Sequence, residues 1–112
     1  MAVNSDETKP SKTAKQNVAG QPLKDIQKTT RFRKDFKRMT SRGYDMDLLR
    51  EVIDVLRKGK MLDEKYLNHQ LEGRWMESYD CHLLPDCVLI YRTTKDSVIL
   101  QAMGTHSDLF KK

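Results

Sequence analysis

Three histidines and one acidic residue carry the chemistry that this 112-residue sequence could perform. His82 stands four residues before Asp86, His106 lies in the terminal stretch GTHSDLF, and His69 is the third histidine. Because an imidazole can both give and take a proton near neutral pH, such a set suits general acid–base catalysis. It could also bind a metal, but the sequence lacks the spacings HxH, HxxxH and HExxH that mark many metal sites. Taken alone, each histidine could equally be a surface or capping residue, so the hypothesis depends on the fold.

The hydrophobic pattern predicts a strand, two helices and three further strands. Residues 23–28 alternate as a short strand, a helix capped by Thr29 or Thr30 runs to about Arg42, and a second runs from Asp45 to Gly59. Residues 60–72 show no clear period and are expected to be a connector. Three strand-like runs follow, joined by short turns: RWMESYDCHLL, CVLIYRT and SVILQAM. We therefore expect an α+β fold, with two helices packed on one face of a mainly antiparallel four-stranded sheet.

This topology predicts where the polar residues meet. The last strand ends beside the Pro85-Asp86 turn, so His82, Asp86 and His106 should converge at one end of the sheet. Strand alternation places Asp80 on the same face as His82. The opposite face of that strand then carries the remaining alternate side chains, Trp75, Glu77, Tyr79 and Cys81. The pattern does not place His69.

Basic charge is concentrated in the first part of the chain. Residues 1–43 hold eleven Lys or Arg against four Asp or Glu, whereas residues 44–112 hold ten against twelve. Between Lys28 and Arg42 seven basic residues accompany one acidic residue, Asp35. Such a density suits a phosphate backbone or an acidic protein partner, and the alternative is an ordinary solvated helix face.

Composition also predicts the domain organisation and the compartment. Residues 1–22 contain Lys, Ser, Thr, Pro and Gly but no aromatic residue, which predicts a disordered arm before a single domain at 23–112. The sequence has no apolar run long enough for a signal peptide or a membrane span, which predicts a soluble, cytoplasmic protein. Cys81 and Cys87 flank a predicted turn; a disulfide is conceivable, but a pair of reduced thiols fits a cytoplasm better.

Several motifs together resemble one protein family. The series LNHQLEGRW, YDCHLLPDCVLIY and MGTHSDLF, with RFRKDFKRM and LLREVIDVLRKG before it, is similar to the YafQ-type toxins of the RelE/ParE toxin–antitoxin superfamily. The resemblance spans residues 23–110. It implies a RelE-type, microbial ribonuclease-like fold and a ribosome-dependent mRNA endoribonuclease that uses no metal or other cofactor. It also implies a cognate acidic antitoxin, similar to DinJ or RelB, as a partner beside the ribosome and mRNA.

The resemblance assigns roles to particular residues. His69, His82, Asp86 and His106 fall on the family's catalytic positions, and Phe110 falls where an aromatic ring can stack a splayed RNA base. A terminal aromatic that closes the core is the competing interpretation of Phe110. In the basic helix the expected contacts with the ribosome, RNA or antitoxin are Arg31, Arg33, Lys34, Lys37 and Arg38.

Two positions depart from the family pattern. Ala102 stands where many relatives have an arginine that would clamp the scissile phosphate, so the chain is expected to be weakly active, degenerate or altered for expression. Arg74, Arg92 or Lys95 could replace that cation only if they reach the site. Cys87 stands where relatives can carry an aromatic substrate contact, which puts that contact in doubt.

Two other functions fit the same fold. One is a non-catalytic binding toxin of the ParE type, which inhibits DNA gyrase, although a binding surface alone needs no group of histidines. The other is an inactive relative that retains only antitoxin or RNA binding, a reading that Ala102 favours.

Overall fold

A single five-stranded sheet organises residues 23–110, the part of the chain that the computed structural model describes. The arm predicted at residues 1–22 lies outside the described residues. The strands occur in the order β1-β5-β4-β3-β2. β1 runs parallel to β5, and the other neighbours are antiparallel. The bounds are β1 Asp25–Lys28, β2 His69–Gln70, β3 Tyr79–Leu84, β4 Cys87–Thr93 and β5 Ser97–Gly104.

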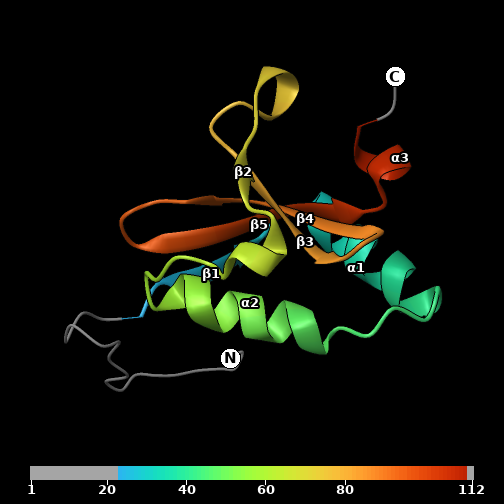
Figure 1. The fold of residues 1–112 in the computed structure, drawn as a ribbon, viewed down its shortest axis with the longest axis horizontal. Helices are drawn as coiled ribbons and strands as arrows, with labels where there is room; N and C mark the ends of the chain where they lie inside the picture. The colour runs from blue at the N-terminus through green and yellow to red at the C-terminus, as the bar shows by residue number, and fades with distance from the viewer. Residues whose placement is uncertain (1–22, 111–112) are drawn as a thin grey trace.

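Helices lie on both sides of this sheet (Figure 1). α1 and α2 pack on one face, and the short α3 lies on the other, close to the C-terminus. Two 3-10 turns, η1 and η2, interrupt the segment between α2 and β3. The bounds are α1 Thr30–Ser41, α2 Asp47–Arg57, η1 Glu64–Tyr66, η2 Gly73–Trp75 and α3 His106–Leu109.

The α+β class is confirmed, but the predicted details are wrong in three respects. The sheet has five strands rather than four, because two residues of the expected connector form β2. A third helix follows β5. The expected strand from residue 74 begins only at Tyr79, because the backbone adopts positive φ at Gly73 and Glu77 and forms η2.

Both predicted helices form, but only the first has the expected side-chain cap, because the N-cap residue of α2 is Met46, which makes no such bond. The Thr29 side chain accepts a hydrogen bond from the Phe32 N–H and caps α1. Asp45 Oδ1 accepts from the Asp47 N–H at 2.8 Å at the start of α2. Phe32 and Met39 of α1 are buried, whereas Phe36 is 37% exposed.

Two separate apolar clusters divide the core between the faces of the sheet. The larger joins α1 and α2 to the alternate side chains of β3, β4 and β5 that include Cys81, Leu89 and Leu100. The smaller contains Val88, Ile90, Ala102 and Leu109, with Leu71, Trp75 and Phe110 packed against it. Trp75 therefore lies across the sheet from Tyr79 and Cys81, contrary to the predicted alternation, because η2 is not extended.

A β-bulge fixes the direction of Ala102. The register of β5 against β4 shifts between Ile90 and Tyr91, so that Ile90 pairs with Ala102 while Tyr91 pairs with Leu100. Gln101 is the extra residue, and its Oε1 accepts from the buried Ser78 hydroxyl at 2.8 Å. As a result Leu100 joins the larger cluster and Ala102 the smaller one.

Side chains of α1 complete the hydrogen bonding of β5 beyond the end of β1. Thr29 Oγ1 donates to the Gln101 carbonyl at 2.8 Å, and Asp35 Oδ2 accepts from the Met103 N–H at 3.0 Å. Arg38 pairs with the same carboxylate at 3.0 Å. α1 is thus fastened to the edge of β5, which would otherwise expose unpaired backbone groups.

Two further sequence predictions can be compared with the described residues. Within residues 23–110 no helix has the length and apolar character needed to cross a bilayer. Cys81 and Cys87 are free thiols, as expected. Burial raises the pKa of Cys81 to about 12 and that of Cys87 to about 11, so both remain protonated near neutral pH.

Candidate active site

His82 and His106 meet at the end of β3 as the sequence predicted. Their Nε2 atoms are 3.2 Å apart, and their ring centroids are 5.1 Å apart. A hydrogen bond between two such nitrogens contains one proton, so one ring donates while the other accepts. The His82 Nδ1 atom is buried and has no partner among the described residues. The pair is therefore already arranged for proton exchange.

The sheet register explains why these two rings meet. His82 of β3 pairs with Val88 of β4, which pairs with Gly104 of β5. The three residues form one row across the sheet, and His106 follows two residues after the last of them. Because Val88 belongs to the smaller cluster, the row presents its side chains on the face opposite α1 and α2.

His106 is the first residue of α3, and this four-residue helix is anchored firmly. A capping box joins Thr105 to Asp108, with hydrogen bonds of 3.0 and 3.1 Å. Arg42 Nη1 from the end of α1 lies 3.0 Å from the Asp108 carboxylate. The Thr105 N–H and Arg42 lower the pKa of Asp108 to about 2. Gly104 permits this contact, because a Cβ there would lie 2.8 Å from the Asp108 Cβ.

His69, which the sequence pattern could not place, joins the same face through β2. It pairs with Asp80 of β3, and its Nδ1 lies 3.3 Å from Asp80 Oδ1. The carboxylate also accepts from the His69 backbone N–H at 3.1 Å. A carboxylate that accepts from Nδ1–H leaves the Nε2 lone pair free. The ring stands nearly perpendicular to that of His82, with centroids 6.3 Å apart.

Asp86, which the resemblance places among the catalytic residues, does not orient either imidazole of the pair. Its side chain is exposed in the β3–β4 turn and makes no hydrogen bond or ion pair with any residue of the 23–110 segment. Only its backbone carbonyl has a partner, the Tyr44 hydroxyl at 3.5 Å. Asp80 is the carboxylate that fixes an imidazole.

Phe110 borders the histidines and also packs on the core. Its ring centroid lies 6.0 Å from that of His106, while its side chain packs against the smaller cluster. The ring therefore packs on the core and also borders the histidines. Stacking of an RNA base on it stays a prediction.

The candidate replacements for the missing arginine differ in position. Arg74 is exposed and lies over the Trp75 ring, with its Cζ 5.5 Å from the ring centroid. Arg92 stands 3.7 Å from Glu77 and is four residues along β4 from Val88, about 13 Å at the usual strand rise. Lys95 lies still farther away in the β4–β5 turn. Arg74 thus lies over Trp75, a ring that packs against the smaller cluster.

The basic residues of α1 fall into two groups. Arg31 and Arg38 both pair with the buried Asp35, at 3.2 and 3.0 Å, and Arg38 also approaches Asp108 at 3.7 Å. Arg33, Lys34 and Lys37 are exposed. The expectation that all five face a partner is therefore too broad for Arg38, which serves mainly to hold α1 against β5 and α3.

Cys87 is not positioned for the substrate contact that was considered. It is 1% exposed and belongs to the larger cluster, on the face covered by α1 and α2. Alternation along β4 directs Val88 rather than Cys87 toward the histidines. We therefore leave Cys87 out of the site.

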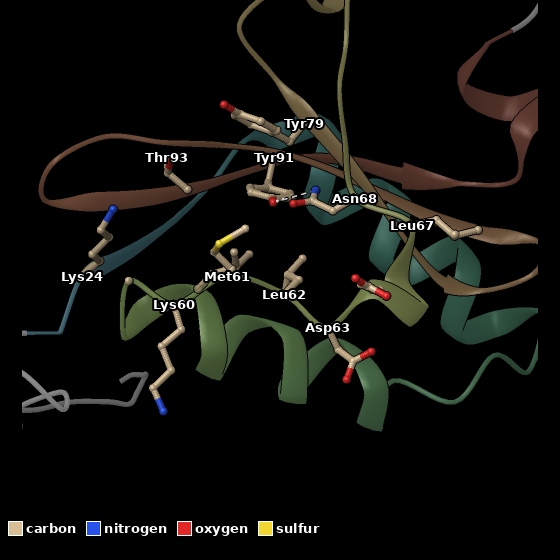
Figure 2. Close-up of a pocket in the computed structure, with 13 residues that line it drawn as sticks. Lys24, Lys60, Met61, Leu62, Asp63, Leu67, Asn68, Tyr79, Tyr91 and Thr93 are labelled. Carbon is tan, nitrogen blue, oxygen red and sulfur yellow. Dashed lines mark hydrogen bonds between the residues drawn. The ribbon is translucent and has the colours of Figure 1, made fainter.

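A hollow of about 530 Å³ lies between the segment after α2 and the strands (Figure 2). None of the histidines lines it. Figure 2 shows Asn68 directed at the Tyr91 hydroxyl, to which it donates at 2.9 Å, with Tyr79 beside it. Burial raises the pKa of Tyr91 to about 12, so this phenol is a poor proton donor or acceptor at neutral pH.

Asp80 and Trp75 are the residues of this face that sequence reasoning left without a role. Alternation did place Asp80 beside His82, but its partner His69 could be found only through the two-residue β2. Trp75 was assigned to the wrong face because η2 was read as a strand. Gly73 was the one local signal of a break in that run.

Comparisons with known proteins identify the family. A sequence model of a bacterial toxin of type II toxin-antitoxin systems, YafQ, matches residues 24–111. The mRNA interferase toxin YafQ of Escherichia coli K12 is 33% identical over 88 residues, which cover 78% of this chain and 96% of that protein.

Solved structures are similar over the same segment. A copper-bound mutant toxin from Helicobacter pylori is 40% identical, with a TM-score of 0.74 over 79% of this chain and 99% of that one. YafQ in the E. coli DinJ–YafQ toxin–antitoxin complex is 32% identical, with a TM-score of 0.72 over 79% and 98%. This chain belongs to the YafQ family of bacterial type II toxins.

Proposed function

We propose that this chain is the toxin of a type II toxin–antitoxin pair and cleaves mRNA as an endoribonuclease. The observation that carries the proposal is the His82–His106 pair, whose Nε2 atoms lie 3.2 Å apart on a polar face of the sheet. The E. coli relative described as an mRNA interferase supports the same reaction class.

The proposed reaction uses the RNA itself as the nucleophile. The 2′-hydroxyl attacks the adjacent phosphorus and loses its proton to a general base, while the departing 5′-oxygen receives a proton from a general acid. A 2′,3′-cyclic phosphate and a 5′-hydroxyl remain. His82 and His106 supply the acid and the base, and the incoming phosphate must part the two rings to lie between them.

Two further side chains assist in this scheme. His69, oriented by Asp80, presents a third imidazole edge-on to His82. Asp86 has a free carboxylate at the adjacent turn that can accept a proton or a hydrogen bond from the RNA. Phe110 stacks a base of the bound strand, which is a common way to hold single-stranded RNA.

The exposed basic residues of α1 form the proposed surface for larger partners. Arg33, Lys34 and Lys37 would contact ribosomal RNA phosphates when the toxin acts, and an acidic DinJ-like antitoxin when it is neutralised. The E. coli DinJ–YafQ complex supports an antitoxin partner. Binding of the cognate antitoxin should weaken as the salt concentration rises.

Cleavage of ribosome-bound mRNA tests the proposed reaction. The purified chain should produce fragments with 2′,3′-cyclic phosphate ends, and the variant His82→Gln with His106→Gln should produce none. Asp96→Asn, in the distant β4–β5 turn, is the matched control and should cleave like the parent. Inhibition of DNA gyrase without RNA cleavage would overturn the proposal in favour of a ParE-type binding toxin.

The same assay should be run with and without a chelator. Two imidazoles can supply both proton transfers, so we expect cleavage to persist in EDTA. The comparison matters because two relatives from H. pylori are described as copper-bound and metal-bound toxins. Loss of cleavage in EDTA, restored by added metal, would contradict a metal-independent reaction.

Co-sedimentation with ribosomes tests the basic surface. Replacing Arg33, Lys34 and Lys37 with Gln should reduce ribosome association whatever the mRNA sequence. The control neutralises three exposed cations elsewhere, Arg50, Lys60 and Lys95. Equal association of the two triple variants would show that the basic residues of α1 are ordinary solvated side chains with no role in ribosome binding.

A further inference from the structure

Two guanidinium groups stack on the only tryptophan in the sequence. The Cζ of Arg31 lies 5.6 Å from the centre of the Trp75 ring, and the Cζ of Arg74 lies 5.5 Å from it. Arg31 belongs to α1, whereas Arg74 and Trp75 belong to η2. Distant segments of the chain therefore meet at one indole, and each contact has the geometry of a cation–π interaction.

This arrangement lies on the histidine face of the sheet. Trp75 packs against the cluster that contains Val88, Ala102 and Leu109, beside Phe110. Arg31 approaches it at the β5 edge, where α1 is fastened to the strand backbone. The two guanidiniums thus lie over a ring that packs against the cluster containing Ala102. Ala102 is the position at which the family resemblance leads one to expect an arginine.

Most of the hydrogen-bond donors of the two arginines remain available. Arg31 uses its Nε on Asp35 Oδ2, at 3.2 Å, which leaves its two Nη groups. Arg74 is exposed and makes no hydrogen bond or ion pair with the described residues. The N–H groups of a guanidinium that lies over an aromatic ring point outward in the guanidinium plane. They remain free to bind a phosphate in bidentate geometry.

The indole itself is held without a hydrogen bond. Trp75 Nε1 is buried and has no acceptor among the described residues. A buried donor without a partner costs free energy, so stacking and packing must keep the ring in place. Arg74 is exposed, and Arg31 and Trp75 are partly buried. An Arg–Trp–Arg arrangement that tolerates this cost fits a binding role better than a purely structural one.

We propose that Arg31, Trp75 and Arg74 form a phosphate subsite for single-stranded RNA, next to the histidine pair. This proposal rests on the proposed function. The part of the RNA held at the subsite would be a phosphodiester next to the scissile one. The subsite supplies positive charge on the face where Ala102 provides none.

The surroundings favour RNA over an acidic peptide as the occupant. Carboxylates could also pair with two arginines. The exposed ring of His106 and the partly buried ring of Phe110 lie on the same face, however, with centroids 6.0 Å apart, and offer flat surfaces to bases. Aromatic surfaces beside arginines are the usual means of holding a single strand.

RNA binding without cleavage tests the subsite. The affinity of a dye-labelled, 2′-O-methyl single-stranded RNA oligonucleotide, which cannot be cut, is measured by fluorescence anisotropy over a range of salt concentrations. The variants are Arg31→Gln and Arg74→Gln, with Arg50→Gln of α2 as the control, because Arg50 is exposed and pairs only with Asp47 among the described residues. The emission of Trp75 reports binding independently.

Each site variant should bind about 10-fold more weakly than the parent, and its plot of log affinity against log salt should be shallower by about 0.7 per lost charge. Arg50→Gln should match the parent. RNA should alter Trp75 emission in the parent and less so in Arg74→Gln. If Arg31→Gln folds poorly, Arg74→Gln still tests the subsite. Arg31→Lys, which keeps the charge, should retain the salt dependence of the parent.

Unchanged affinity and salt dependence in Arg74→Gln would overturn the subsite. So would an oligoglutamate peptide that displaces the RNA as effectively as unlabelled RNA does, because the surface would then be a site for acidic proteins. The result is separable from the cleavage assay. A chain that binds RNA through these arginines but cuts no mRNA would contradict the reaction and support the subsite.

Discussion

The two faces of the β-sheet differ in the side chains that they carry. The face beneath α1 and α2 carries a continuous apolar cluster in which Leu89, Val98 and Leu100 are fully buried. The other face carries only a small apolar cluster, surrounded by three histidines, Asp80 and two arginines. Because alternate residues of the same strands serve the two faces, a single register determines both stability and chemistry.

The faces also differ in how completely their polar groups are paired. On the helix side α1 satisfies the free edge of β5 through Thr29 and Asp35. On the histidine side two buried atoms, His82 Nδ1 and Trp75 Nε1, have no partner among residues 23–110, whereas α1 has one such atom, Arg38 Nε. Unpaired buried groups reduce stability, and proteins commonly tolerate them where function needs them. We therefore expect substitutions on one face to change folding and those on the other to change activity.

The largest expected effect is on catalysis. His106→Ala should lower mRNA cleavage by about 10²- to 10⁴-fold, the range for loss of a general acid or base. The free energy of unfolding should change by less than about 0.5 kcal/mol, because His106 is exposed. Cleavage kinetics and urea unfolding of the same preparation provide both measurements. Retained cleavage would remove His106 from the catalytic pair.

The opposite result is expected on the helix face. Leu89→Ala should lower the free energy of unfolding by about 2–5 kcal/mol, because Leu89 is fully buried in the larger cluster. The cleavage rate per folded molecule should stay close to that of the parent. A large loss of rate in fully folded protein would show that the two faces are not independent.

Ala102→Arg should raise cleavage activity and lower stability at the same position. An arginine there should increase cleavage by about 10²-fold, the scale of one preorganised charge donor. Because Ala102 is fully buried, the longer side chain should also destabilise the fold by about 1–3 kcal/mol. Cleavage kinetics and thermal unfolding would test both parts. No gain in a folded variant would mean that another cation, such as Arg31 or Arg74, already fills the role.

The helix face was the more predictable of the two. Hydrophobic period and capping residues indicated α1, α2 and the three long strands, because burial of large apolar side chains imposes a regular pattern. The meeting of His82 with His106 followed from short turns and antiparallel pairing.

The histidine face was harder to predict because non-local contacts build it. β2 has two residues, too few for a visible alternation, so the pairing of His69 with Asp80 left no signal in the sequence. η2 resembled a strand, which put Trp75 on the wrong face and hid its stacking with Arg31. A side chain from α1 and a turn before β3 can be brought together only by the folded sheet.

A smaller effect is expected where α1 supports the histidine face. Asp108→Asn removes the charge that pairs with Arg42 and weakens the capping box with Thr105, so α3 should hold His106 less firmly. We expect about a 10-fold loss of cleavage and about 1 kcal/mol of stability, the scale of a helix cap. Asp54→Asn on α2, a carboxylate that pairs with Lys58, is the matched control. Equal effects of the two substitutions would show that α3 needs no such anchor.

The smallest expected effect is the pH dependence of this anchor. The Thr105 N–H and Arg42 hold the pKa of Asp108 at about 2, below its ordinary value of 3.8, so the folded chain binds this proton more weakly than the unfolded chain does. Its stabilisation is therefore complete above the ordinary value and is lost as the pH falls from about 4 toward 2. Urea unfolding of the parent and of Asp108→Asn across this range should show the stability difference between them shrinking. Because the other carboxylates are common to both proteins, their titration cancels in the comparison. A difference that stays constant down to pH 2.5 would mean that Asp108 is not held as the ionised partner of Arg42.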